Sequence, residues 1–261
     1  ILSALLANLN AHQALSKLGI DSPTLESDLA EMVDEGTRTL LDAQNFDGGW
    51  SWWPGEAFED AQSDVFTTTF VMLGLTQVSQ AGLDVPQQVL ERGMAYLFHY
   101  LQEPSELDAP WKLDQLAFQV YALRYSEMSL EPYLDGLFTR RAELSPWSLG
   151  LLGLSIDQIE GRNNRVSTIL RDLEALAVRT ATGVHWDSAG NIWSLPGSPN
   201  FNTAIGLYTL AQLDPASTSL PLALRYLLVH RTPAGLWSST FESAWALMAI
   251  TEALQGTGDY Q

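Results

Sequence analysis

Apolar side chains recur at intervals of three and four residues along most of the chain, which is the period of helices with one buried face. The first such face is formed by Leu2, Leu5, Leu6, Leu9 and Ala14. This helix should end at Gly19, because glycine accepts the left-handed conformation of a helix C-terminus. The next should begin at Ser22 and Pro23, an N-cap and a first-turn proline, and run to about Asp42.

The same period predicts nine further helices of similar length. They are expected at residues 63–81, 86–101, 113–126, 130–141, 146–159, 165–179, 200–213, 219–230 and 239–254. Asp214-Pro215 and Thr232-Pro233 mark ends among the later ones, since the residue before proline avoids the helical region. Strand patterns are rare. Residues 183–193 carry the exception, two short β-like segments flanking residues 188–191, and this predicts a hairpin.

A weak internal repeat indicates a ring. Three times a loop with glycine or tryptophan precedes a helix of small and apolar residues, with Trp50, Trp193 and Trp237 at the matching points. Helices that are apolar all round are buried, and here they alternate with amphipathic ones. We therefore predict an all-α fold, an α/α toroid of about six hairpins in one domain, residues 1–261. Six hairpins would need twelve helices and the pattern predicts eleven, so we expect that a first helix lies in sequence upstream of this chain.

Composition narrows the function. The chain has 31 acidic and 13 basic residues, a formal charge of −18, so it lacks the large basic face that nucleic acids or anionic membranes require. It has no cysteine, which excludes disulfides, thiolate zinc sites and cysteine nucleophiles within these residues. No apolar run approaches the ~20 residues of a membrane span. Because it begins with Ile1 inside an apolar-periodic stretch, we interpret it as a piece of a longer polypeptide.

Several motifs occur in the order of a known family. They are Ser3-Ala-Leu-Leu-Ala-Asn-Leu9, Gln44-Asn-Phe-Asp-Gly-Gly-Trp-Ser-Trp-Trp-Pro-Gly55, Tyr226-Leu-Leu-Val-His-Arg231, Gly235-Leu-Trp-Ser-Ser-Thr240 and Ser243-Ala-Trp-Ala-Leu247. Together they resemble the thioester domain of bacterial alpha-2-macroglobulins, over nearly the whole chain. The first resembles the helix directly after that family's Cys-x-Glu-Gln thioester motif, and the second its Gly-Gly-aromatic loop.

The resemblance implies a non-enzymatic protease inhibitor. In the family, cleavage of a bait segment exposes a buried thioester, which a nucleophile on the protease attacks. The partners implied are target proteases and neighbouring macroglobulin domains of the same parent chain, and the location implied is extracytoplasmic: periplasmic, secreted or anchored to the cell envelope. No catalytic, cofactor-binding or metal-binding residue is expected in this span, and no cofactor.

The chain departs from the family pattern at the reactive residues. Without cysteine no thioester can form inside it. Either the motif lies just before Ile1, which we expect, or the natural protein belongs to a subgroup that lacks the thioester. Relatives of the complement type use a catalytic histidine between the Gly-rich loop and the next helix. Residues 51–64 contain none, so the resemblance implies direct attack by lysine amines.

The four histidines, His12, His99, His185 and His230, offer little chemistry. No two have the four-residue spacing of a helical metal site, and structural or solvent-facing roles are expected. His185, beside Trp186 in the predicted hairpin, has no partner visible in the sequence.

Acidic residues near tryptophans support an alternative. Glu56, Glu59, Asp60 and Asp64 lie close to Trp50, Trp52 and Trp53, and an α/α-ring enzyme on polysaccharide or isoprenoid substrates would use such groups. A solvated loop with a helix cap at Asp64 is the simpler interpretation. The Gly-Gly-Trp50 loop also resembles the repeat of squalene-type cyclases, but Asp42, Asp47 and Asp60 are too scattered for their Asp-rich motif. Recurring tryptophans favour packing between hairpins.

Overall fold

A computed structural model describes residues 1–17, 19–52, 63–187 and 197–257. Within these ranges it contains eleven α-helices, two short 3-10 helices (Pro104–Glu106 and Arg141–Glu143) and one two-stranded sheet. The predicted all-α toroid is confirmed. None of the helices in the described ranges is long and apolar enough to cross a membrane.

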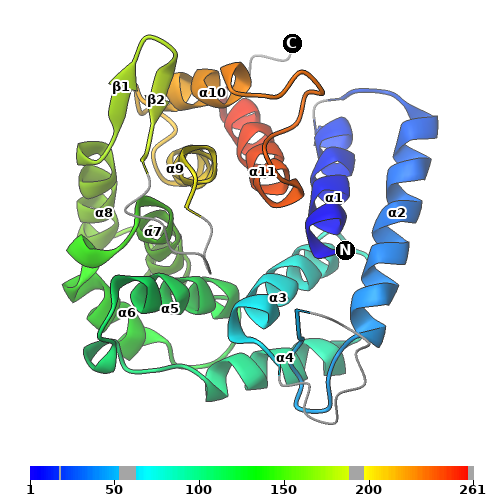
Figure 1. The fold of residues 1–261 in the computed structure, drawn as a ribbon, viewed down its shortest axis with the longest axis horizontal. Helices are drawn as coiled ribbons and strands as arrows, with labels where there is room; N and C mark the ends of the chain where they lie inside the picture. The colour runs from blue at the N-terminus through cyan, green and yellow to red at the C-terminus, as the bar shows by residue number, and fades with distance from the viewer. Residues whose placement is uncertain (18, 53–62, 188–196, 258–261) are drawn as a thin grey trace.

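Six helices form the inner wall of the ring (Figure 1). They are α1 (Leu2–Lys17), α3 (Val65–Gln80), α5 (Pro110–Leu123), α7 (Pro146–Glu160), α9 (Pro199–Leu213) and α11 (Thr240–Thr257). Each contacts the next, and α11 packs against α1, so that the first and last helices close the ring. Inner helices have little amphipathicity because neighbours surround them: all residues from Pro146 to Ile156 of α7 are buried.

Five helices form the outer layer. They are α2 (Pro23–Asp42), α4 (Gln87–His99), α6 (Glu131–Thr139), α8 (Asn164–Ala175) and α10 (Leu220–Val229). Each follows one inner helix, packs against it and returns the chain to the start of the next. They are amphipathic, as in α8, where only Val166, Ile169 and Leu173 are buried.

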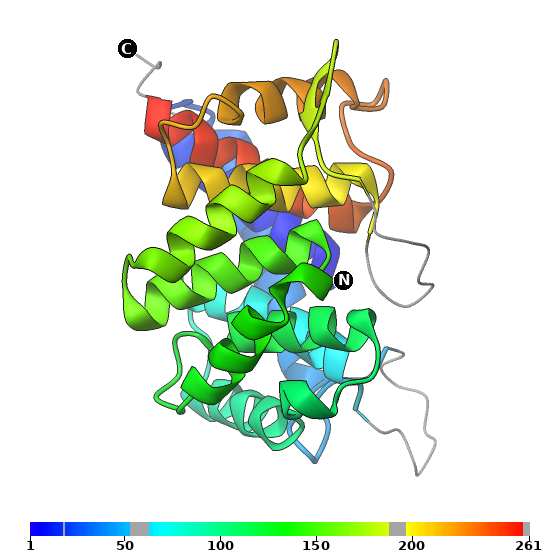
Figure 2. The same cartoon turned by 90° about the vertical axis from the view of Figure 1, so that its left-hand side faces the viewer.

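This alternation places the beginnings of the inner helices on one side of the ring. We call that side the N-terminal mouth. The N-terminus lies on it, right of the centre of Figure 2. The ends of two helices follow the sequence prediction: Gly19 (φ 64°) and Gly82 (φ 82°) adopt the left-handed conformation directly after α1 and α3.

Three predicted helices have boundaries that differ by three or more residues. One is the last, which was expected to end at residue 254 and is α11, ending at Thr257. The helix expected at 113–126 is α5, which begins at Pro110, because Ala109 is extended and proline fits the first helical turn. The helix expected at 165–179 is α8, which ends at Ala175. Residues 178–180 instead form a strand, in agreement with the preference of β-branched Val178 and Thr180. Ser22 occupies the N-cap position of α2, but its side chain makes no capping hydrogen bond.

The predicted hairpin is displaced along the chain. Strand β1 (Val178–Thr180) pairs in antiparallel register with β2 (Gly183–His185), with Val178 opposite His185. The segment predicted as the first strand is therefore the second, and the predicted turn and second segment at 188–193 lie outside the described residues. Gly183 (φ 140°) is required there, since a Cβ would lie 2.3 Å from the Leu222 carbonyl oxygen.

Candidate functional site

Aromatic side chains from five inner helices form a continuous band of ring contacts toward the N-terminal mouth. We call this band the aromatic circuit; its members are Phe66, Phe70, Phe118, Trp147, Phe201 and Phe241. Successive ring centroids lie between 4.7 and 6.1 Å apart, from Phe66 through Phe118, Trp147 and Phe201 to Phe241 and Phe70. Offset and edge-to-face contacts at such distances are favourable. Phe70, Phe118, Trp147 and Phe201 of the circuit are buried, and Phe66 and Phe241 are half-buried.

Three tryptophans join the outer layer to the inner one by the same pair of hydrogen bonds. The indole nitrogens of Trp50, Trp186 and Trp237 donate to the carbonyl oxygens of Leu40, Leu173 and Leu227 at 2.7, 2.7 and 3.2 Å. Their backbone N–H groups donate to the hydroxyls of Thr68, Thr203 and Ser243 at 2.8, 3.3 and 3.1 Å. Each therefore ties the preceding outer helix to the following inner helix.

This pattern corrects one member of the predicted repeat. Trp186, and not Trp193, is the counterpart of Trp50 and Trp237, and Trp193 lies outside the described residues. The signal in the sequence was a glycine shortly before the tryptophan, at Gly183, as at Gly49 and Gly235. The expectation that the recurring tryptophans pack between helices is confirmed for Trp50 and Trp237, which are 2% and 5% exposed. Trp186, which is 0% exposed, packs in the same way.

The Gly-rich loop before α3 is held by its own polar side chains. Gln44 Nε2 donates to the carbonyl oxygens of Gly48 and Val89 at 2.9 and 3.0 Å. Asp47 Oδ1 accepts from the Gly49 N–H and the Ser63 hydroxyl. Gly48 (φ 93°) lies against α4, where a Cβ would come within 2.6 Å of the Arg92 carbonyl oxygen. The motif residues described here build a fixed connection at the mouth.

Some of the acidic residues proposed as catalytic candidates lie in the described part of the chain, and the others lie outside it. Asp64 caps α3, accepting from the backbone N–H and the hydroxyl of Thr67, both at 2.7 Å, and Asp42 is exposed at the end of α2. Trp52 is 65% exposed. Glu56, Glu59, Asp60 and Trp53 lie outside the described residues. The cap predicted at Asp64 is thus confirmed.

Two of the four histidines meet in one stack, which the sequence did not reveal. The rings of His185 and His230 both stack on the ring of Tyr226, with centroid distances of 4.6 and 3.9 Å. His185 Nε2 also lies 3.1 Å from Asp187 Oδ1, so the expectation that it lacks a partner was wrong. His12 is half-buried on α1, and His99 is exposed with its ring edge against Tyr100. The residues in the described ranges form no cluster of three metal-ligating side chains.

A buried carboxylate on α5 was missed by the sequence reasoning. Asp114 is 3% exposed and accepts from the Ser145 N–H at 2.9 Å, the Ser145 hydroxyl at 2.6 Å and the Ser148 hydroxyl. Burial raises the pKa of Asp114, and the hydrogen bonds from Ser145 and Ser148 act against that shift. Asp114 thereby joins α5 to the first turn of α7, where a helix N-terminus favours negative charge.

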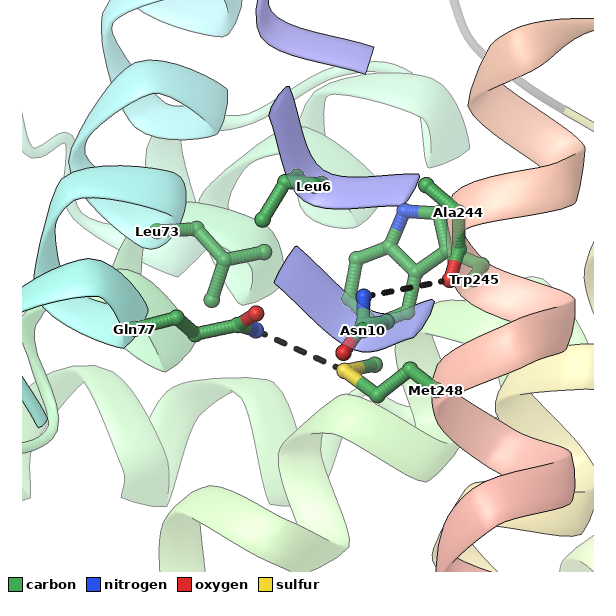
Figure 3. Close-up of a pocket in the computed structure, with 7 residues that line it drawn as sticks. All are labelled: Leu6, Asn10, Leu73, Gln77, Ala244, Trp245 and Met248. Atoms are coloured by element: carbon green, nitrogen blue, oxygen red, sulfur yellow. Dashed lines mark hydrogen bonds between the residues drawn. The ribbon is translucent and has the colours of Figure 1, made fainter. Parts of the chain in front are cut away.

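The joint that closes the ring is tightly packed. Side chains of α1, α3 and α11 meet around a cavity of about 10 Å³, space for one water molecule. Figure 3 shows Asn10 Nδ2 donating to the Ala244 carbonyl oxygen at 3.4 Å and Gln77 Nε2 directed at the Met248 sulfur at 3.4 Å. The interior at this joint therefore leaves no room for an organic substrate.

Comparisons with known proteins agree on one family. No protein-family model matches the chain. It is 41% identical over 239 residues to an alpha-2-macroglobulin of Thermotoga maritima, covering 90% of this chain and 12% of that protein. It is 32% identical over 117 residues to an alpha-2-macroglobulin of Escherichia coli, covering 43% and 7%. The chain thus spans only a small part of these relatives.

Solved structures share the fold. Salmonella alpha-2-macroglobulin reacted with methylamine superposes with a TM-score of 0.73 at 21% identity, over 96% of this chain and 16% of that one. Escherichia coli alpha-2-macroglobulin activated by porcine elastase gives 0.71 at 23% identity, over 96% and 22%. At this level of identity the likeness establishes the toroid and leaves the chemistry to be argued separately.

Proposed function

Since the chain is homologous to a segment of the bacterial alpha-2-macroglobulins, we propose that it is the body of a thioester domain in an extracytoplasmic protease-trapping protein. In this proposal it catalyses no reaction. It shelters a thioester that is contributed by parent sequence adjoining Ile1, and it presents that bond when the parent is cleaved. Its partners are the captured protease and the neighbouring domains of its own chain.

The observation that carries the proposal is the position of α1. Its first residue lies at the N-terminal mouth (Figure 2). Four members of the aromatic circuit, Phe66, Trp147, Phe201 and Phe241, lie in the first turns of their inner helices, on the same side. Ser3 to Leu9 on α1 resemble the helix that follows Cys-x-Glu-Gln in the family, so the motif would adjoin this end. The apolar side chains of Leu2, Leu5 and Leu6 pack into the ring core beneath it. A thioester survives only away from water, and apolar cover of this kind excludes water.

The chemistry needs no side chain of this chain as a catalyst. A lysine amine of the protease attacks the thioester carbonyl carbon, the carbon–sulfur bond breaks, and an amide forms. The thiolate leaves and takes up the proton that the amine nitrogen loses. The described histidines lie in helices or in the stack with Tyr226, in agreement with direct attack by amines without a histidine intermediate. The alternative of an α/α-ring enzyme gains no support from Asp47 or Asp64, which are engaged in a loop and a helix cap.

Methylamine provides the test, because it is a small amine that opens thioesters. We expect the intact parent protein to incorporate one methylamine and release one thiol, measured by mass spectrometry and thiol titration. After incubation with trypsin it should form conjugates that resist denaturant. The isolated chain, which has no cysteine, is the matched control and should take up none. A folded parent that incorporates no methylamine would overturn the proposal and favour a purely structural domain.

A further inference from the structure

A second cavity, of about 220 Å³, opens between the first turn of α3, the end of α4 and one face of α5. Trp111, Gln115 and Gln119 line it from α5, and Tyr100 and Gln102 line it from the segment after α4. It is far larger than the cavity at the ring joint. None of the residues proposed to shelter the thioester bond lines it, so it calls for a separate explanation.

Gln119 is an unsatisfied donor in this cavity. Its side chain is 4% exposed, and its Nε2 has no hydrogen-bond partner among the residues that the structure describes. Buried amide groups in folded proteins are almost always paired, so an unpaired donor that lines an open cavity indicates a place for a ligand acceptor. Gln115 and Trp111 lie one and two helical turns toward the start of α5, and both are half-buried. The cavity thus has an amide donor at its buried end and an aromatic ring nearer its rim.

The charge of the cavity favours a neutral ligand. Among the described residues that line it there is no carboxylate, so these residues offer a cation no counter-charge. Lys112, the cation among the described lining residues, is already paired, with its Nζ 2.6 Å from Asp108 Oδ1 and 5.7 Å from the centre of the Trp111 ring. An anion would have to compete with Asp108 for it.

We propose that this cavity binds one unit of a neutral saccharide. Its volume of about 220 Å³ suits a single ring and is smaller than sites for drug-sized ligands. Sugar hydroxyls both donate and accept, as do the amides of Gln102, Gln115 and Gln119. The aromatic faces of Tyr100 and Trp111 match the apolar face of a sugar ring. An extended peptide, at about 3.3 Å per residue, would be too long to be enclosed by this cavity.

The test titrates the 261-residue chain with glucose, galactose, mannose and N-acetylglucosamine. Heteronuclear NMR would follow the side-chain amide of Gln119, and calorimetry would measure affinity. We expect saturable binding of at least one sugar and a shift of the Gln119 amide signal. Gln119→Leu, which keeps the volume and removes the donor, should weaken binding about tenfold. Gln77→Leu, a half-buried amide at the ring joint, should bind as the unaltered chain does.

Gln115→Leu gives a second variant at a half-buried site, in case Gln119→Leu does not fold, and it should also weaken binding several-fold. Absence of saturable binding by all four sugars would overturn the proposal. So would sugar affinity that is the same in both cavity variants as in the unaltered chain. Binding of a blocked alanine dipeptide instead, lost in Gln119→Leu, would assign the cavity to a peptide and equally overturn the saccharide assignment.

Discussion

The indole Nε1 of Trp50 donates a 2.7 Å hydrogen bond to the carbonyl oxygen of Leu40, near the end of the preceding outer helix. The same bond recurs from Trp186 to Leu173 and from Trp237 to Leu227. In each case the following inner helix supplies a hydroxyl to the tryptophan N–H. The tryptophan joints are thus a repeated device that sets how the outer layer meets the inner one.

Replacing Trp50 by phenylalanine should destabilise the chain by about 1–3 kcal/mol, since the Leu40 carbonyl oxygen would lose its partner in a buried place. Urea denaturation followed by circular dichroism would measure the change in unfolding free energy. Trp52→Phe is the control: Trp52 is 65% exposed, and its replacement should change stability by less than about 0.5 kcal/mol. Equal losses in the two variants would contradict the role of the joint.

Gly206 on α9 should tolerate no larger residue. A Cβ there would lie 2.7 Å from ring atoms of Trp186, so Gly206→Ala must displace the indole that holds the second joint. We expect a loss of about 1–3 kcal/mol, typical of overpacking, although alanine is the better helix former. Thermal unfolding and near-ultraviolet circular dichroism would measure it. An unchanged or raised melting temperature would show that the joint is loosely packed.

Asp114 should make stability fall as pH rises. Burial raises the pKa of Asp114 above its ordinary value, so the folded chain holds this proton more tightly than the unfolded chain. By linkage, its contribution is fully present below the unfolded pKa and is lost as pH rises through the folded pKa. The unfolding free energy of the unaltered chain, relative to Asp114→Asn, should therefore decrease over that interval, as measured by urea denaturation at several pH values.

Asp108 provides the control of opposite sign. A hydrogen bond from Lys112 and the charge of that side chain lower the pKa of Asp108, so its contribution is lost as pH falls. The difference between the unaltered chain and Asp108→Asn should therefore change in the other direction, and only weakly, because this carboxylate is exposed. The same slope for both variants would contradict the assignment of the Asp114 shift to burial.

The aromatic circuit should protect the reactive bond as well as the fold. Phe201, which contacts Trp147 and Phe241, is 2% exposed, and Phe201→Leu should lower stability by about 1–2 kcal/mol. In the intact parent protein the same change should admit water and speed the spontaneous loss of methylamine reactivity. Leu154→Val, a core change on α7 outside the circuit, should leave that rate unchanged. If both variants lose reactivity equally fast, general loosening and not the circuit is responsible.

The amino-acid pattern by itself determined the layered architecture. A helix that is apolar on all sides, such as α7, is stable only when other helices surround it. Because such helices alternate along the chain with amphipathic ones such as α8, the chain must form an inner and an outer layer. Local chemistry also fixed several ends, because Gly19 and Asp64 act through conformations and hydrogen bonds of their immediate neighbours.

Only the tertiary structure decided which side chains meet. Asp114 and Ser145 are separated by 31 residues, and His185 and His230 both stack on the ring of Tyr226, from β2 and from the end of α10. Sequence spacing carries no information on such pairs, since the path of the intervening helices sets their distance. For the same reason the sequence did not distinguish Trp186 from Trp193 as the third member of the repeat, since both follow Gly183. Only the position of Leu173 on α8 identifies Trp186 as the tryptophan whose indole is bonded.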